Sequence, residues 1–252
     1  MAAEVAMFLQ VIQGRVPDRS AMRVQHDRWL AEIGSDAPGW LGSTAGVTED
    51  DRFVCLSRFS SAEALVRLGA RTDQREWWAR TERLFLGPVV TAEFHDVEIM
   101  LEGGADDASF VQVVQGRATD TARLAVLQKE LLRHLPDGRP DMIGGLAAVG
   151  PDGRFMRVFY FSDEELARAG EHGEPLPEVA EIDFDLRELS GEPTYHDLRH
   201  PWLASPPPAG PAAGRAGETS ASETGAGAAR SAAKAGSEPW SQPDRRAAAR
   251  RR

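Results

Sequence analysis

The chain has almost no cysteine: Cys55 is the single one among 252 residues. An internal disulfide framework and a cysteine-rich zinc site are therefore excluded. No apolar run approaches the ~18–20 residues that a membrane-spanning helix needs, so no membrane partner is expected. The first fifteen residues lack the basic start of a secretory signal peptide, and we therefore expect a cytoplasmic protein.

Basic residues are also scarce over most of the chain. Residues 1–203 hold 21 Lys and Arg against 35 Asp and Glu, whereas residues 204–252 hold eight against four. Nucleic-acid binding needs clustered Lys and Arg, so a nucleic-acid partner is not expected. The sequence also lacks a glycine-rich dinucleotide fingerprint, a P-loop and a G-x-S-x-G elbow. Nucleotide cofactors and a serine hydrolase are disfavoured for that reason.

What the chain does contain is an internal repeat. The segment FLQVIQGR at 8–15 returns as FVQVVQGR at 110–117, an offset of 102 residues. The same offset relates residues 52–60 to 154–162. A period near 100 residues is too long for a solenoid unit and indicates two homologous domains. We assign residues 1–103 to the first domain and residues 104–203 to the second.

Periodicity in the first domain predicts the order β-α-β-β-α-β. The predicted strands cover residues 7–13, 40–47, 52–59 and 89–101. A helix is predicted from an N-cap at Asp18 to Ile33. A second helix over 61–68 follows a cap at Ser60, and a helical pattern continues around 76–85.

The sequence of the second domain predicts the same order of strands and helices, with one difference. Its predicted elements cover residues 110–115, 121–135, 142–149, 154–161, 163–169 and 181–189. Residues 181–189 alternate and predict the fourth strand, which makes the second helical region much shorter than in the first domain. Residues 193–203 are expected to pack on the core in extended form. From residue 204 the composition turns to Ala, Gly, Ser and Pro, which predicts a disordered tail over 204–252.

The β-α-β-β-α-β order is the ferredoxin-like unit. Two such units, the Trp77-Trp78 pair and the lead Gly87-Pro88-Val89-Val90 resemble the dimeric α/β-barrel superfamily, and within it the antibiotic biosynthesis monooxygenase (ABM)-like group. The resemblance covers residues 7–189. It implies an α+β fold in which two ferredoxin-like repeats form a pseudo-dimeric α/β barrel from one chain. Members include cofactor-independent oxygenases of aromatic polyketides, haem-degrading enzymes and proteins without known chemistry, so the fold selects no reaction.

The chain departs from the haem-degrading members of this superfamily. Those enzymes combine a Trp in this helix with an Asn on the first strand and a His after the Trp. Here the first strand has Gln10 and Gln13, and no His lies between Trp78 and Phe94. Haem is therefore disfavoured, and no cofactor is expected.

Two histidines are candidates for catalysis. His26 lies on the apolar face of the first predicted helix, and its counterpart in the second domain is Gln128. A titratable group that faces the sheet in one repeat alone fits a general base, or a core histidine bonded to a backbone carbonyl. His95 shares one face of the predicted fourth strand with Val97 and Ile99, and lies either beside a pocket or at the seam between the repeats.

Further residues are candidates for ligand contact. Trp77 and Trp78 could stack on a planar substrate, or pack in the core. Arg58, matched by Tyr160, could hold an anionic group, with a solvated strand-edge arginine as the alternative. The pair His196 and His200 has a metal-ligand spacing if it is helical, but no third ligand is in place, and no metal is predicted.

Two function classes remain open. The first is a cofactor-independent, monooxygenase-like enzyme that acts on a small aromatic or planar molecule in a pocket of the first domain, with His26 as the base. The second is a non-catalytic small-molecule-binding or interaction protein of the same fold. The resemblance favours the enzyme, whereas the shorter second helical region favours the binding protein. Either class is compatible with a homo-oligomer.

Overall fold

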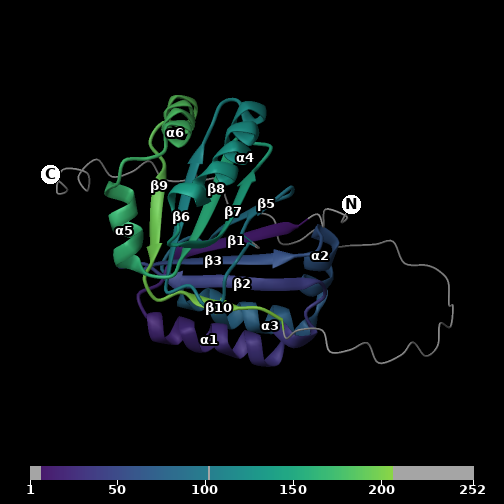
Figure 1. Cartoon of the computed structure of the whole chain (residues 1–252). Coiled ribbons are helices and arrows are strands. Elements are labelled where there is room, and N and C mark those ends of the chain that lie inside the picture. Colours follow the sequence, from purple (N-terminus) through teal and green to yellow (C-terminus); the bar gives the residue numbers. More distant parts are fainter. Residues whose placement is uncertain (1–6, 102, 207–252) are drawn as a thin grey trace, which may run out of the picture.

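The computed structural model describes residues 7–101 and 103–206. It contains two five-stranded antiparallel sheets with helices on their outer faces (Figure 1). The predicted α+β class with two ferredoxin-like repeats is confirmed. The predicted disordered tail lies, from residue 207 on, outside the described residues. Within the described ranges, no helix has the length and apolarity that membrane crossing requires.

The first repeat follows the predicted order. Its elements are β1 (Phe8–Arg15), α1 (Arg19–Glu32), β2 (Trp40–Val47), β3 (Arg52–Phe59), α2 (Ala62–Ala70), α3 (Thr72–Thr81), β4 (Val90–Phe94) and β5 (Glu98–Met100). Asp18 caps α1 as predicted, since its carboxylate accepts the Ala21 N–H at 2.8 Å. The predicted cap of the second helix is one residue early, because the Ser61 hydroxyl accepts the Ala64 N–H.

The second repeat contains a full second helical region. Its elements are β6 (Phe110–Arg117), α4 (Thr121–Gly138), β7 (Met142–Val149), β8 (Arg154–Phe161), α5 (Glu164–His172), α6 (Pro177–Ser190), β9 (Thr194–Leu198) and β10 (Trp202–Ala204). The predicted strand over 181–189 is wrong, because these residues belong to α6. This helix buries Val179, Ile182 and Leu186 at helical spacing and leaves Phe184 64% exposed. The predicted shortening of this repeat is therefore also wrong.

The two repeats exchange their last strands. The predicted strand over 89–101 breaks after Phe94, where Asp96 adopts φ = 47°, and β5 crosses to pair with β7. Reciprocally, β10 leaves the second repeat and pairs with β2. Sheet one has the order β10-β2-β3-β1-β4, and sheet two has the order β5-β7-β8-β6-β9. The exchange covers the edges of β2 and β7 and joins the two halves through main-chain hydrogen bonds.

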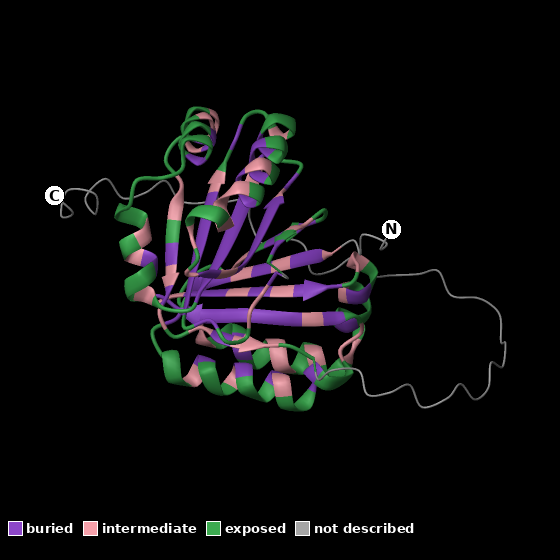
Figure 2. Ribbon diagram, viewed as in Figure 1, coloured by how far each residue is buried: buried purple, intermediate pink, exposed green. Residues whose placement is uncertain are grey.

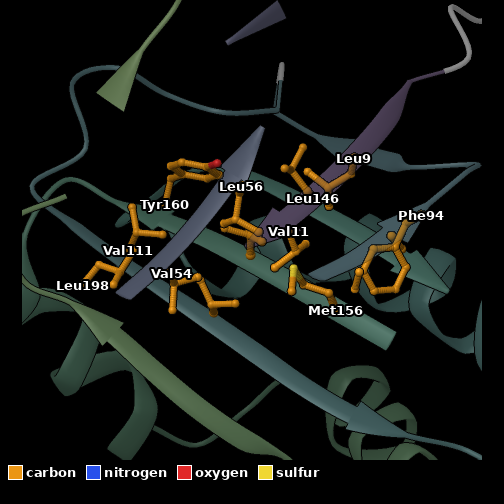
Figure 3. Packing of buried hydrophobic residues seen from close by; sticks show 14 of the residues in the cluster. Leu9, Val11, Val54, Leu56, Phe94, Val111, Leu146, Met156, Tyr160 and Leu198 are labelled. Carbon is orange, nitrogen blue, oxygen red and sulfur yellow. The ribbon is translucent and has the colours of Figure 1, made fainter. Parts of the chain in front are cut away.

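The two sheets pack face to face around an apolar core (Figure 3). Its labelled members, each at most 1% exposed, are Leu9, Val11, Val54, Leu56, Phe94, Val111, Leu146, Met156, Tyr160 and Leu198. The Tyr160 hydroxyl and the Thr44 hydroxyl form a 2.7 Å hydrogen bond. Figure 2 shows that the strands are buried while the helices expose their outer sides. The space between the sheets is filled with these side chains, which leaves the outer faces, beneath the helices, for a ligand site.

Candidate functional site

The outer faces of the two sheets differ at two neighbouring positions of their central strands. On β3 the side chains that face the helices include Cys55 and Ser57. The equivalent positions on β8 hold Arg157 and Phe159, because β3 and β8 keep the same register against β1 and β6. The first repeat therefore has two small side chains where the second has two large ones.

With this difference, the outer face of the sheet is less completely buried in the first repeat than in the second. The central residues of this face, Gln10, Ile12, Cys55 and Ser57, are all partly exposed, although α1 and α3 lie over this side of sheet one. Burial raises the pKa of the Cys55 thiol to about 11. We call this partly exposed outer face, with these four residues as its floor, the first-repeat recess. Their counterparts in the second repeat, Gln112, Val114, Arg157 and Phe159, are all buried.

His26 projects from α1 on the side of sheet one that carries the recess. Met22, His26 and Trp29 form the buried stripe of α1. The imidazole ring packs on the indole of Trp202, with the ring centroids 5.4 Å apart. Trp202 lies on β10 opposite Ala45, which is itself opposite Cys55. This chain of neighbours places His26 beside the recess, on its β2 side.

Burial determines the electrostatic state of His26. Its side chain is 7% exposed, and neither ring nitrogen has a hydrogen-bond partner among the described residues. Nδ1 lies 3.7 Å from Asp27 Oδ1, which is too long for a hydrogen bond. Desolvation lowers the pKa of His26 to about 4. The ring is therefore neutral at pH 7 and carries an unpaired lone pair. The predicted alternative of a bond to a backbone carbonyl is wrong.

The two tryptophans of α3 have different surroundings. The Trp77 indole N–H donates to the Gln25 carbonyl oxygen at 2.8 Å, and the ring packs with Trp29, so Trp77 ties α3 to α1. Trp78 is partly exposed, and its ring lies 6.3 Å from that of Phe85. Its indole N–H has no hydrogen-bond partner within the described part of the chain. Of the two, Trp78 is the one free to contact a ligand.

The floor of the recess extends to the β4 edge of sheet one. Thr91 lies opposite Ile12, and Glu93 lies opposite Gln10, so both face the helix side of the sheet. Both side chains are exposed. At the opposite side of the floor, Ser43 is opposite Ser57, and its buried hydroxyl has no partner among the described residues.

The structure does not bring His95 or Arg58 into the recess. His95 lies in an exposed bend after β4, not on a strand, with its ring edge 5.0 Å from Phe8. It follows one edge strand of sheet one, whereas His26 packs on the other, about 19 Å away at ~4.8 Å per strand. Arg58 is 7% exposed and alternates with Leu56, so it points between the sheets. Its predicted alternative as a solvated strand-edge arginine is also wrong.

The histidine pair with metal-ligand spacing is not helical. His196 is 8% exposed on β9, opposite Val113 of the inner core, and His200 is exposed beyond that strand. Across the described residues, no group of three or more His, Cys, Asp or Glu side chains could hold a metal ion.

Comparison with known proteins identifies the fold. No family model matches the chain, and no curated protein matches it in sequence. A proposed monooxygenase from Fusobacterium nucleatum superposes with a TM-score of 0.67 at 11% identity, over 80% of this chain and 95% of that one. A proposed monooxygenase from Lactobacillus acidophilus gives 0.63 at 12% identity, over 79% and 96%. The chain shares the fold of these two proteins.

A third match shares this fold. An anthrone oxidase-like protein superposes with a TM-score of 0.57 at 12% identity, over 80% of this chain and 94% of that one. At identities this low, the likeness establishes the fold and does not extend to the reaction.

The buried histidines of this chain should make its stability depend on pH. Desolvation lowers the pKa of both His26 and His196 from 6.5 to about 4. Between pH 4 and 6.5 the unfolded chain therefore binds more protons than the folded one. The stability that each neutral histidine contributes is complete above pH 6.5 and is lost as the pH falls towards 4. From pH 7 to pH 4.5 we expect a loss of about 2 kcal/mol for each histidine.

Urea unfolding at both pH values measures this loss. His26→Gln copies the residue at the equivalent position of the second repeat, Gln128, and should remove about half of the pH dependence. If the variant and the parent lose the same stability at pH 4.5, His26 is not the buried neutral group described above.

Proposed function

We propose that the first-repeat recess binds a small planar aromatic molecule and that His26 acts on it as a general base in a cofactor-independent oxidation. The observation that carries the proposal is a buried imidazole, with both nitrogens unpaired, beside a floor of small side chains. The second repeat has Gln128 in place of the imidazole, and Arg157 and Phe159 in place of the small floor residues. The first repeat thus combines an imidazole with small floor residues, and the second repeat has neither.

The residues around the recess suit a flat ring system with polar substituents. Trp78, which is partly exposed, offers an aromatic surface. The hydroxyl groups of Ser43 and Ser57 and the amide of Gln10 lie in one row across the floor, where they can bond to ring substituents.

The chemistry requires a substrate whose CH2 group is acidified by adjacent aromatic rings. His26 removes one proton, and the resulting carbanion reduces O2 and forms a C–O bond. The imidazolium returns its proton to the peroxide. Loss of the second C–H proton then breaks the O–O bond and leaves a carbonyl group and water. The sum, CH2 + O2 → C=O + H2O, balances with O2 as the oxidant. The fold shared with an anthrone oxidase-like protein supports this substrate class.

A second candidate function is binding of the same class of molecule without turnover. The lack of further titrating groups in the recess favours binding without turnover. Its other polar groups do not titrate near neutral pH: Ser43, Ser57 and Gln10 are uncharged, and burial keeps the Cys55 thiol protonated. His26 would have to act without a second acid or base from the described residues of the floor.

Oxygen consumption with anthrone as the probe separates the two functions. We expect His26→Gln to slow conversion of anthrone to anthraquinone by about 100-fold or more, while quenching of tryptophan fluorescence shows that anthrone still binds. His172→Gln, in an exposed position on α5, is the matched control and should keep the parent rate. Binding without oxygen consumption by the parent chain would favour the binding function. Equal rates in His26→Gln and the parent would remove His26 as the base.

A further inference from the structure

The outer face of sheet two carries a buried arginine without an ionic partner. Arg157 is 6% exposed, and its Nε has no hydrogen-bond partner. Among residues 7–101 and 103–206, no carboxylate forms an ion pair with it. Its guanidinium carbon lies 5.1 Å from the centroid of the Phe155 ring. Burial lowers the pKa of Arg157, yet a guanidinium remains charged in proteins.

Arg157 lies within a row of side chains that ends at solvent. On the face beneath the helices the row runs through Ala147, Arg157, Val114 and Tyr195. Tyr195 is 52% exposed on the edge strand β9. In the first repeat the equivalent row, Ala45, Cys55, Ile12 and Thr91, forms part of the floor of the recess. The second repeat thus has a cation, Arg157, at the position where the first repeat has the small neutral side chain of Cys55.

The acids nearest to Arg157 are engaged elsewhere. Asp183 on α6 accepts the Arg187 Nε–H at 2.8 Å and acts on Arg157 only through space. Glu192 also lies towards Arg187, at 3.9 Å. A second largely buried arginine of this repeat, Arg139, is by contrast held by both carboxylate oxygens of Asp141. Leaving a buried charge unpaired is strongly destabilising, so its retention calls for a purpose other than stability.

We propose that Arg157 anchors an anion site in the second repeat that takes the carboxylate of a small organic acid, entering at the β9 edge beside Tyr195. The planar guanidinium matches a carboxylate through two parallel N–H···O bonds. The neighbouring Phe155, Phe159 and Val114 are apolar, which favours an organic acid over an inorganic anion. The site is separate from the first-repeat recess and does not depend on the function proposed for that recess.

The test measures the melting temperature of the full chain with benzoate at constant pH and ionic strength. We expect 10 mM benzoate to raise the melting temperature of the parent by several degrees and to have no effect on Arg157→Met. Without benzoate, Arg157→Met should melt at the same temperature as the parent or higher, because it removes an unpaired buried charge. Arg133→Met, which removes an exposed guanidinium from α4, is the control and should keep the benzoate effect.

An NMR measurement on the parent chain keeps the test decisive if Arg157→Met fails to fold. The Nε–H resonance of Arg157 should move on titration with benzoate and should move much less with inorganic phosphate. The same benzoate effect in Arg157→Met as in the parent would overturn the proposal. So would the absence of any benzoate effect on the melting temperature and on the Nε–H resonance of the parent.

Discussion

Replacing Trp202 with alanine should lower the free energy of unfolding by about 3–5 kcal/mol. Trp202 is 7% exposed and packs on His26 and on Phe53, with ring centroids 5.4 and 6.1 Å apart. The Arg23 guanidinium also lies over its ring at 5.2 Å. Because β10 belongs to the second repeat by sequence and to sheet one by pairing, the change loosens a connection between the repeats and leaves a cavity above β2.

Urea unfolding at pH 7 measures the loss. Trp78→Ala removes the same side chain from a partly exposed position on α3 and should cost much less, about 1–2 kcal/mol. In Trp202→Ala the pKa of His26, followed by NMR, should rise towards 6.5, because the indole that excludes water from the ring is gone. Equal losses in the two variants would contradict a structural role for the exchanged strand.

Much of the fold could be predicted from the sequence because the repeats carry strong local patterns. The strands over 40–47 and 52–59, and their partners over 142–149 and 154–161, begin and end in the structure where the alternation predicts. Each is eight residues long and lies inside a sheet, so most of its side chains are buried. Asp18 was equally predictable, since an N-cap depends on three consecutive residues of its own chain.

The strand exchange could not be predicted because its signal is not local. β5 and β10 are three residues long, and a period of two over three residues does not say which sheet a strand joins. The positions of His95 and Trp202 depend on that choice. The error at α6 has another cause. Phe184 is an exposed apolar residue, and together with Ile182 and Leu186 it imitates the alternation of a strand.

The candidate site was partly visible in the comparison of the two repeats. His26 stood out because its counterpart, Gln128, does not titrate. The same alignment showed that the first repeat has Ser57 where the second repeat has Phe159. The sequence did not show which face of the strand carries this position. In the structure this position faces the helices, and the opposite face fills the core. Sequence alternation alone does not tell the two faces of a doubly covered sheet apart.

Ser57→Phe should abolish ligand binding in the first-repeat recess by copying the residue that the second repeat has at this position. Ser57 lies opposite Gln10 on β1 and opposite Ser43 on β2, at the centre of the floor. A phenyl ring there would occupy the space above both neighbours. We expect the affinity for anthrone to fall by at least about 100-fold, which corresponds to about 3 kcal/mol. Fluorescence titration measures it.

The same variant tests whether the recess is open. A phenyl ring forced into a packed interior costs about 1–3 kcal/mol, whereas a ring that enters existing space costs little. We therefore expect Ser57→Phe to melt within a few degrees of the parent. The reverse change, Phe159→Ser, empties a packed position and should cost about 3 kcal/mol without altering anthrone binding. If Ser57→Phe is as destabilised as Phe159→Ser and still binds anthrone, then the ligand site lies elsewhere and the two repeats are filled alike.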